Sequence, residues 1–445
     1  MTHSLLIKNA RLVNDGQIVE ADLRIINDKI GRIESELNAI HNEEVVDAEG
    51  CCLLPGMIDD QVHFREPGLT HKGTIASESR AAVAGGITSY MEMPNVNPAT
   101  TSIEMLEKKY VIASESSIAN YAFYLGATED NLEQVKRLDP KKHCGMKVFT
   151  GASTGDLLVE KPEALDGIFR ESPALIAAHC ENGPLIAKNY ELIKRTGKEP
   201  TILEHPTIRN AEACYASSSY AVSLAKQYQS QLHVLHITTE RELSLFDNGP
   251  IENKRITAEA CVHHLWFCDE DYPLLGNLIK CNPAIKTAND RDALIKALHT
   301  NQIDIIATDH APHTLGEKQQ AFNLAPAGLP LIQYALLTLF DHVSERRLSL
   351  EQVVEKTAHN PAKRYGVEGR GFIREGSFAD LVLVNTNTPF IATHENSLYH
   401  CGWTPFVNHQ FTSRIKSTWV NGQQVFDGQK VIDQPCPSKR LTFNR

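Results

Sequence analysis

The ends of the chain carry one pattern of hydrophobic and polar residues, and the middle carries another. Near both ends, short alternating runs are separated by tight-turn sequences such as Asn14-Asp15-Gly16 and Asn421-Gly422. This spacing is typical of small antiparallel strands. The runs cover residues 4–7, 21–26, 29–33, 379–384, 417–420 and 424–426. We therefore predict one small β domain built from both ends of the chain, residues 1–55 and 370–445.

In residues 56–369, apolar runs of strand length alternate with segments of helical character. The predicted strands are residues 52–58, 86–93, 121–125, 145–149, 174–179, 232–236, 255–259 and 303–309. A helix from Glu78 to Ala84 is expected before the second strand. Eight such units with helical connections predict an α/β fold, a (β/α)8 barrel of the TIM type. We find no repeat of 20–50 residues that would favour a solenoid.

The first predicted strand breaks directly into polar residues, the stretch from Asp59 to Gly68. A buried parallel strand that delivers polar side chains at its carboxyl end has this pattern, and α/β barrels keep their chemistry at that end. Side chains alternate along a strand, so Gln61, His63 and Arg65 should share one face. A single histidine at a strand end is more often structural, and partners elsewhere are needed to change that interpretation.

Such partners occur at the ends of other predicted strands. The candidates at or just after five different strand ends are His63, Lys147, His179, His236 and Asp309. Strand ends converge on one pocket in a barrel, and imidazoles with a carboxylate suit a divalent ion such as zinc. The sequence therefore predicts a metal site with an open position for water. The alternative is that one or two of these side chains only make hydrogen bonds in the barrel rim.

Composition narrows the classes of function. The chain has 44 basic and 55 acidic residues, a net charge of −11 and no long basic block, which argues against nucleic-acid binding. Its ten cysteines show no repeated Cys-x-x-Cys spacing, and the N-terminus lacks a signal-peptide pattern. We expect free thiols in a cytoplasmic enzyme. No run of eighteen or more apolar residues occurs, so we expect no membrane span.

Several short motifs follow one another in a specific order. They are Asp59 to Gly68, Gly85-Gly86-Ile87-Thr88, Met93-Pro94-Asn95, His179-Cys180-Glu181, Leu235-His236-Ile237, Glu259 to His264, Asn282-Pro283, Thr308 to His313, Asn360-Pro361-Ala362-Lys363 and Gly376 to Leu381. With these motifs the chain resembles dihydroorotases of the amidohydrolase superfamily, of the long-chain class, over nearly its whole length. The family's first motif is Asp-x-His-x-His-x-Arg-Glu-Pro-Gly, and the chain departs from it at Gln61.

The resemblance implies a site with two metal ions, expected to be zinc. His63 and Asp309 would bind the more buried ion, and His179 and His236 would bind the second. A carbamate formed from carbon dioxide on Lys147 would bridge the two, since a free ammonium cannot bind cations. Many close dihydroorotases have Asp at this position instead, and the alternative is an unmodified lysine paired with a carboxylate. Asp309 would also be the general acid and base.

Gln61 stands where the family has its first metal-binding histidine and is a doubtful ligand. An amide oxygen is a poorer donor to zinc than an imidazole, so the more buried ion should be bound more weakly than the second. The same departure raises the alternative of an inactive homologue that acts as a scaffold, for instance for aspartate transcarbamoylase. The five retained candidate residues favour an active enzyme over this alternative.

The implied reaction is the reversible cyclisation of N-carbamoyl-L-aspartate to (S)-dihydroorotate in pyrimidine biosynthesis, by a metal-activated hydroxide. The substrate-binding residues implied are Arg65, Asn95, Asn282, His313, Ala327 and Gly328. Arg65 would bind the α-carboxylate through its planar double donor. Allantoinases and hydantoinases share the metal site and the carbamylated lysine, but a substrate without a carboxylate gives no reason to bury a guanidinium. The expected partners are the small-molecule substrate, a second copy of the chain in a homodimer, and aspartate transcarbamoylase.

Overall fold

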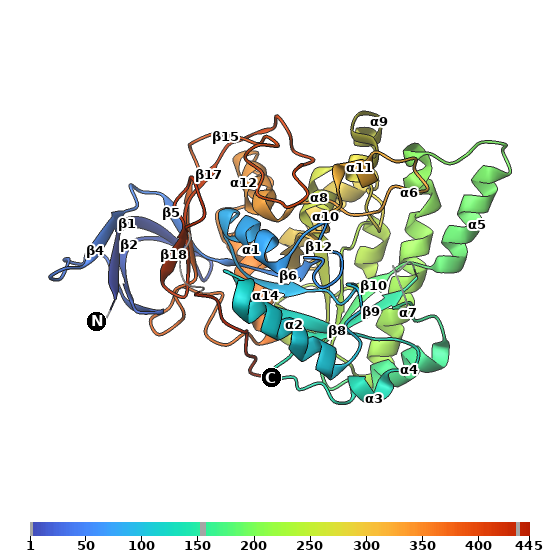
Figure 1. Cartoon of the computed structure of the whole chain (residues 1–445), viewed down its shortest axis with the longest axis horizontal. Helices are drawn as coiled ribbons and strands as arrows, with labels where there is room; N and C mark the ends of the chain where they lie inside the picture. Colours follow the sequence, from blue (N-terminus) through green and yellow to red (C-terminus); the bar gives the residue numbers. More distant parts are fainter. Residues whose placement is uncertain (1–2, 152–156, 433–436) are drawn as a thin grey trace.

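The two sequence patterns, at the chain ends and in the middle, correspond to two separate sheets. The computed structural model describes residues 3–151, 157–432 and 437–445. In Figure 1 the small sheet lies at the left of the molecule, with N-terminal strands in blue beside C-terminal strands in dark red. A parallel barrel with its surrounding helices makes up the rest (Figure 1). The predicted fold, a barrel with a β domain built from both chain ends, is confirmed.

The small sheet has eight strands in the order β18-β17-β14-β5-β1-β2-β3, with β4 paired to β1. Their bounds are β1 (Ser4–Asn14), β2 (Gln17–Ile26), β3 (Lys29–Glu34), β4 (Glu44–Asp47), β5 (Cys52–Pro55), β14 (Leu381–Asn385), β17 (Arg414–Val420) and β18 (Gln423–Phe426). The antiparallel pair of β5 with β14 joins the two ends of the chain. Asp15 and Asn421 form the expected tight turns with φ of 50° and 49°.

The barrel has eight parallel strands in sequence order. They are β6 (Met57–Val62), β7 (Ile87–Glu92), β8 (Asn120–Gly126), β9 (Gly145–Thr150), β10 (Ile176–Cys180), β11 (Leu232–Val234), β12 (Ile256–Cys261) and β13 (Ile305–Ala307). Its ends meet where Val62 bridges His310, and the backbone N–H of His63 donates to the carbonyl of His310 over 2.7 Å. The carboxyl ends of the first and last strands are therefore held side by side.

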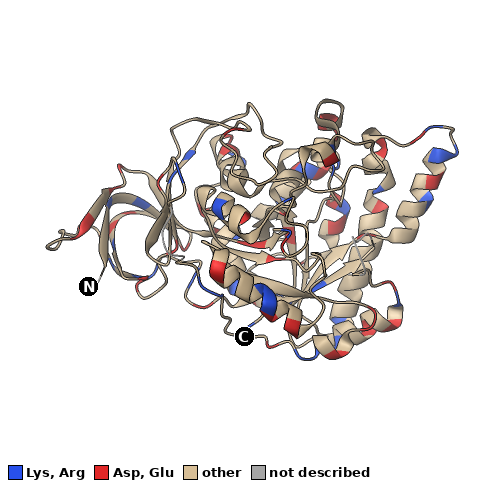
Figure 2. Ribbon diagram, viewed as in Figure 1, with Lys and Arg blue, Asp and Glu red and all other residues tan. Residues whose placement is uncertain are grey.

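Helices cover the outside of the barrel. The longer ones are α1 (Ile75–Ala84), α2 (Ile103–Ser116), α4 (Pro162–Glu171), α5 (Gly183–Lys194), α7 (Ala211–Tyr228), α10 (Ala288–His299) and α12 (Ala335–Ser344). The shorter ones are α3 (Leu132–Val135), α6 (His205–Ile208), α8 (Val262–Trp266), α9 (Tyr272–Leu275), α11 (Leu315–Lys318), α13 (Leu350–Val354) and α14 (Asn360–Tyr365). Acidic and basic residues are interspersed along them (Figure 2). No helix among the described residues is both long and apolar enough to cross a membrane.

The nine cysteines within the described ranges are free.

Several element bounds differ from the prediction, and three of the differences bear on the site. The run of residues 52–58 is not one strand, because the chain passes from β5 of the small sheet to β6 of the barrel at Gly56. A Cβ at Gly56 would lie 2.2 Å from the side chain of Thr88, so only glycine fits this crossing. Helix α1 begins earlier than predicted, because Thr74 caps it by accepting from the N–H of Ser77. Strand β13 is shorter than predicted, and Asp309 beyond it has a left-handed backbone with φ of 48°.

Between β14 and β17 the chain leaves the small sheet. Strands β15 (Phe390–Ile391) and β16 (Gln410–Phe411) pair with each other, and the connecting residues run beside the barrel (Figure 1). We call residues 396–403 the C-terminal strap. Trp403 in this strap is fully buried and donates from its ring nitrogen to the carbonyl of His313 over 2.7 Å. The domain boundaries at residues 55 and 370 stay a prediction.

Candidate active site

A cavity of about 230 Å³ opens at the carboxyl ends of the barrel strands. All twelve residues that the sequence analysis named line it: Gln61, His63, Arg65, Asn95, Lys147, His179, His236, Asn282, Asp309, His313, Ala327 and Gly328. Four further lining residues were not predicted, and they are Phe149, Arg209, Ala311 and Pro326. Side chains from seven different strand ends or loops thus meet in one place, as the barrel topology requires.

Arg65 provides the cationic end of the cavity. It does not continue strand β6, because the strand ends at Val62 and Arg65 has a left-handed backbone with φ of 73°. Its Nε donates to the carbonyl of Pro312 over 3.0 Å, which fixes the plane of the guanidinium. Burial lowers the pKa of Arg65 to about 10, so the side chain stays charged at neutral pH. Among the described residues no carboxylate pairs with Arg65, and a buried cation of this kind suits an anionic ligand.

His313 lies beside Arg65 and is neutral. Burial, followed by the charges of Arg65 and Lys72, places the pKa of His313 well below its usual range. Lys72 Nζ is 3.1 Å from its Nδ1, and Arg65 Nη2 is 3.0 Å from its Nε2. Nε2 is also 3.0 Å from the carbonyl of Ala327, which connects His313 to the loop on the opposite wall. This corner therefore combines two cations with a neutral imidazole.

His63 and Asp309 form the first pair of predicted ligands. His63 Nδ1 is 2.6 Å from Asn95 Oδ1, and Nε2 is 3.0 Å from Asp309 Oδ1. Burial lowers the pKa of His63. Burial also acts to raise the pKa of Asp309, but the hydrogen bond and charge of His63 outweigh it and the pKa lies below its usual value. Asp309 is therefore ionised and able to accept a proton.

His179 and His236 form the second pair. His179 Nδ1 lies 3.0 Å from His236 Nε2, and their rings meet edge to face. His179 Nε2 is 3.1 Å from Glu181, which also pairs with Arg209. Although burial acts to raise it, Arg209 and His179 lower the pKa of Glu181 to about 2. Glu181 thus fixes the His179 ring with its Nδ1 lone pair toward His236.

Lys147 lies within β9, at the floor of the cavity. It is about 1 % exposed, and its Nζ lies 4.6 Å from the centre of the Phe149 ring. Within the described ranges it forms no ion pair with a carboxylate. Burial lowers the pKa of Lys147 to about 8. The neutral amine, which is the form that reacts with carbon dioxide, is therefore more abundant at neutral pH than in an ordinary lysine.

Gln61 is turned so that its oxygen faces away from the first pair. Its Nε2 donates to Asp309 Oδ1 over 3.2 Å, and its Oε1 lies 3.7 Å from the thiol of Cys261. A carboxylate only accepts and a thiol donates, so both contacts favour this orientation of the amide. The group that Gln61 presents toward Asp309 is thus an NH₂ group, which does not bind metal ions.

The donor set fits divalent metal ions. His63 Nε2 and Asp309 Oδ1 share the ring proton across 3.0 Å, and a cation in place of that proton would be held by both atoms. Nδ1–H of His63 would then donate to Asn95. His236 Nδ1 has no hydrogen-bond partner among the described residues, and burial keeps the pKa of His236 well below its usual range. The facing nitrogens of His179 and His236 have nearly the spacing, about 3.3 Å, of two ligands on a tetrahedral zinc ion.

Two other groups in the described residues also have ligand atoms within 4.8 Å of one another. They are Asp60 with His233 and Glu259, and Cys261 with His263 and His264. In the first group, burial acts to lower the pKa of His233, but Asp60 and Glu259 raise it to about 9. A protonated His233 between two carboxylates offsets part of their negative charge. The predicted metal ligands do not form such a three-residue group; they form the two pairs described above.

Two functional contacts were missed by the sequence analysis. Glu181 belongs to the quoted motif His179-Cys180-Glu181, and a carboxylate two residues after a ligand histidine was a signal that could have been used. Arg209 follows the short helix α6 and gave no local signal, because its partner is 28 positions away. Both act on His179 and neither is an expected substrate ligand.

The chain was compared with known proteins. The model of the amidohydrolase family matches residues 52–425. Over 424 residues, 95% of this chain and 97% of the relative, it is 31% identical to the dihydroorotase of Halobacterium salinarum. Over 436 residues, 96% of this chain and 100% of the relative, it is 31% identical to the dihydroorotase of Bacillus subtilis.

Solved structures of the same architecture are similar over almost the whole chain. L-hydantoinase (dihydropyrimidinase) from Arthrobacter aurescens superposes with a TM-score of 0.93 at 24% identity, covering 99% of this chain and 100% of that one. Dihydropyrimidinase from Brevibacillus agri gives 0.88 at 23% identity, again covering 99% and 100%. At this identity the likeness supports the fold alone. Together with the family match over most of the sequence, these findings establish that the chain belongs to the amidohydrolase family.

Proposed function

We propose that the protein is a dihydroorotase, which interconverts N-carbamoyl-L-aspartate and (S)-dihydroorotate. The observation that carries this proposal is Arg65, a buried guanidinium that lines the same cavity as the predicted metal ligands. A guanidinium binds a carboxylate through two parallel hydrogen bonds. Dihydroorotate carries such a carboxylate on its ring, and the relatives named dihydroorotase support the same substrate.

The metal assignment is part of the proposal. His63 and Asp309 would hold one zinc ion, His179 and His236 a second, and a carbamate on Lys147 would lie between them. When bound, the metals would activate a water molecule and polarise the ring carbonyl. Lys147 supports this arrangement because it is buried, forms no ion pair within the described ranges, and has a lowered pKa.

In this reaction the side chains that line the cavity have different roles. Arg65 binds the substrate carboxylate and so fixes which face of the ring points toward Asp309. The carboxylate of Asp309 accepts a proton in the hydrolytic direction and returns it to the departing ring nitrogen. Asn95 and His313 add hydrogen bonds, and Asn282 with the backbone at Ala327 and Gly328 would contact the ring.

A hydantoinase-type enzyme is the second candidate. The lysine at position 147 favours it, because hydantoinases share the carbamylated lysine. Arg65 opposes it, because a cyclic diamide without a carboxylate would leave this buried cation unpaired at a large cost in desolvation. An inactive scaffold is disfavoured because twelve predicted site residues meet in a single cavity.

Cytoplasmic location, a homodimer and association with aspartate transcarbamoylase stay predictions. Analytical ultracentrifugation would measure the last two.

The proposed function is tested by following both directions of the reaction by proton NMR. Purified enzyme with zinc should cyclise carbamoyl-aspartate at mildly acidic pH and hydrolyse dihydroorotate at alkaline pH, because ring closure removes a carboxylate charge and consumes a proton. The same protein should leave hydantoin and allantoin unchanged. Turnover of hydantoin without turnover of either carboxylate substrate would assign the protein to the second candidate.

Gln61 should make the two metal sites unequal. We expect purified enzyme to retain about one tightly bound metal, at His179 and His236, and to take up the second only at higher concentration, with activity rising as it does. The Gln61→His variant should bind the second metal roughly 10- to 100-fold more tightly, by analogy with the loss of metal-supporting groups. Calorimetric zinc titration with parallel activity assays measures both constants. Gln61→Leu, which adds no ligand, is the control and should not tighten the site.

Two outcomes would contradict the expectation of unequal metal sites. Two equal and tight sites in the unmodified protein would show that Gln61 or another group replaces the missing histidine. A Gln61→His variant with unchanged metal affinity would show that position 61 does not face the metal.

Carbamylation of Lys147 in metal-free protein should depend on pH. At a fixed total bicarbonate concentration, the carbamate should increase as the pH rises toward about 8, the lowered pKa of Lys147, and then level off. The direction follows because the protonated amine must lose its proton before it reacts, and above its pKa no further proton is lost. Carbon-13 NMR of protein in labelled bicarbonate measures the carbamate signal. A signal that keeps rising beyond pH 9 would indicate an ordinary exposed lysine.

A further inference from the structure

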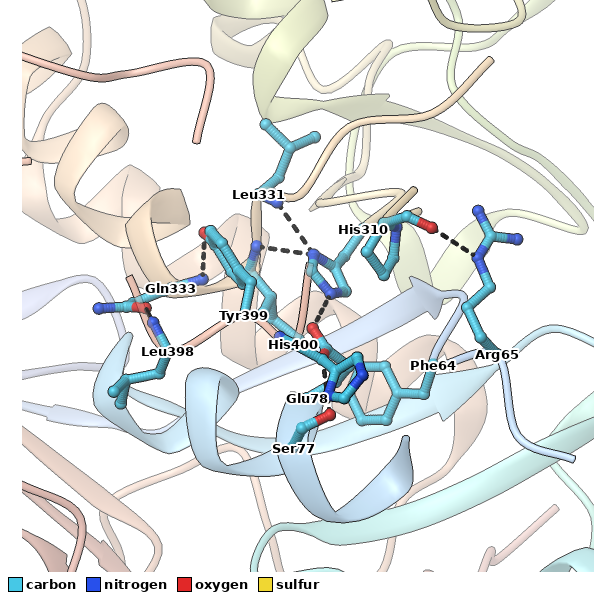
Figure 3. A network of polar contacts seen from close by, with 12 residues as sticks. Phe64, Arg65, Ser77, Glu78, His310, Leu331, Gln333, Leu398, Tyr399 and His400 are labelled. Atoms are coloured by element: carbon cyan, nitrogen blue, oxygen red, sulfur yellow. Dashed lines mark hydrogen bonds and ion pairs between the residues drawn. The ribbon is translucent and has the colours of Figure 1, made fainter. Parts of the chain in front are cut away.

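A buried carboxylate outside the cavity connects helix α1, the C-terminal strap and the loop after β13 that carries Asp309 and His313. Glu78 on helix α1 is fully buried and does not line the cavity. Its Oε2 is 2.7 Å from His310 Nε2, and its Oε1 accepts from the backbone N–H of His400 over 3.0 Å. Figure 3 shows these contacts converging on Glu78 from the barrel loop and from the C-terminal strap. Ser77 Oγ also donates to Oε1, over 2.8 Å.

Each ring nitrogen of His310 has one hydrogen-bonding role, either acceptor or donor. Its Nδ1 accepts from the backbone N–H groups of Leu331 and Ile332, over 2.9 and 3.3 Å. The proton of the neutral ring is therefore on Nε2, and it is donated to Glu78. Because Nδ1 accepts these hydrogen bonds it carries no proton, and the ring is neutral. Glu78 thus selects the tautomer that leaves Nδ1 free to accept from the loop.

His310 is joined through its backbone to the residues around the cavity. It directly follows Asp309, and its carbonyl accepts from the N–H of His63 over 2.7 Å. The next residue, Ala311, donates to the carbonyl of Leu329 over 2.8 Å. Fixing the ring of His310 therefore fixes the carboxyl ends of β6 and β13 and the loop that leads from Gly328 to Ile332.

The C-terminal strap completes the arrangement. The hydroxyl of Tyr399 accepts from the N–H of Gln333 over 3.0 Å, and Gln333 Oε1 accepts from the N–H of Leu398 over 2.7 Å (Figure 3). The Tyr399 and His310 rings lie 5.3 Å apart. At its other end the strap reaches His313 through the Trp403 hydrogen bond. The strap thus contacts His310, which directly follows Asp309, and His313, which lies beside Arg65.

We propose that Glu78 is a positioning residue. Through His310 and the strap it fixes the positions of Asp309 and His313 relative to Arg65. The proposal rests on the proposed function, because these three side chains are the expected proton-transfer and carboxylate-binding groups. A carboxylate is required, because two of its three partners, the N–H of His400 and the Nε2–H of His310, can only donate, and they face different carboxylate oxygens. Glutamine has the same shape but only one acceptor, so one of its NH₂ hydrogens must face a donor.

The test compares Glu78→Gln with Glu242→Gln. Glu242 is also buried, and it accepts from the hydroxyls of Ser218 and Thr239, which can rotate and donate or accept. Glu242→Gln should therefore leave kcat and KM for dihydroorotate unchanged. Glu78→Gln should lower kcat/KM by about 10- to 100-fold, the range for a misplacement near 1 Å, with both a lower kcat and a higher KM. Equal melting temperatures of the two variants would separate this effect from loss of folding.

A double-mutant cycle asks whether Glu78 acts through His310. In His310→Asn, the amide oxygen can replace Nδ1 toward Leu331, but the shorter side chain does not reach Glu78. Adding Glu78→Gln to this background should cost little further activity, because the contact is already lost. Additive losses from the two substitutions would contradict the proposal.

Hydrogen exchange gives a readout that needs no substrate. Glu78→Gln should speed exchange in peptides covering residues 329–333 and 396–403, and Glu242→Gln should not. If the unmodified protein does not turn over dihydroorotate, the proposed function fails while this exchange result still decides whether Glu78 organises the two segments. Unchanged exchange in both peptides, or unchanged kinetics in an active Glu78→Gln enzyme, would overturn the proposal.

Discussion

Replacing Lys147 by alanine should lower kcat for dihydroorotate by about 10²- to 10⁴-fold, the range for loss of one positioned group in the chemical step. The reason is charge: the carbamate would supply two anionic oxygens to two cations, and alanine supplies none. Because truncation leaves space at the cavity floor, acetate or propionate should occupy it and restore part of the activity. Initial rates with increasing carboxylic acid, at constant zinc, measure this rescue.

Lys147→Met is the matched control for the rescue. Methionine fills the same volume and carries no charge, so we expect the same loss of activity and no response to added acid. The unmodified enzyme should also be indifferent to the acid. Full activity of Lys147→Ala without any carboxylic acid would remove Lys147 from the metal site. Recovery of the stripped unmodified enzyme by zinc alone, with bicarbonate rigorously excluded, would show that the lysine acts unmodified.

Arg65→Lys should weaken binding of both carbamoyl-aspartate and dihydroorotate by about 1.5–3 kcal/mol, the range for a hydrogen bond to a charged group. This corresponds to roughly 10- to 150-fold in kcat/KM. Lysine keeps the charge but replaces the planar double donor by a single ammonium. The lost binding free energy therefore measures the contribution of the two-point contact. Steady-state kinetics in both directions measure it.

Arg209→Lys is the control for the effect of Arg65. Arg209 lines the same cavity but pairs with Glu181, so its replacement should act on metal affinity through His179. We expect zinc to restore the activity of Arg209→Lys and not that of Arg65→Lys. If Arg65→Lys had unchanged kinetics for both substrates, Arg65 would not bind the carboxylate.

The barrel and most of the cavity were predictable because their signals are local. Apolar runs of strand length mark the strands, and a polar residue at the end of a run marks the rim of a barrel. His179 was found in this way. Lys147 was predicted at a strand end but lies inside β9, and both side chains line the cavity. The family motifs added residues from loops, such as Asn282 and Gly328, whose positions have no periodic pattern.

The supporting contacts were not predictable because they depend on packing between distant segments. Glu78 meets His310 across 232 positions and the backbone of His400 across 322. No spacing rule connects such residues, and Glu78 alone is indistinguishable from an exposed charge at a helix start. The crossing at Gly56 was missed for a similar reason, since one apolar run serves two different sheets.

The most direct measurement compares two rings that differ only in the carboxylate, (S)-dihydroorotate and 5,6-dihydrouracil. With zinc-loaded enzyme, hydrolysis of each is followed by the loss of ultraviolet absorbance of the ring amide, and the two values of kcat/KM are compared. The account predicts a strong preference for dihydroorotate that falls markedly in Arg65→Lys, while the low rate with dihydrouracil stays unchanged. Comparable or faster hydrolysis of dihydrouracil by the unmodified enzyme would contradict the assignment as a dihydroorotase.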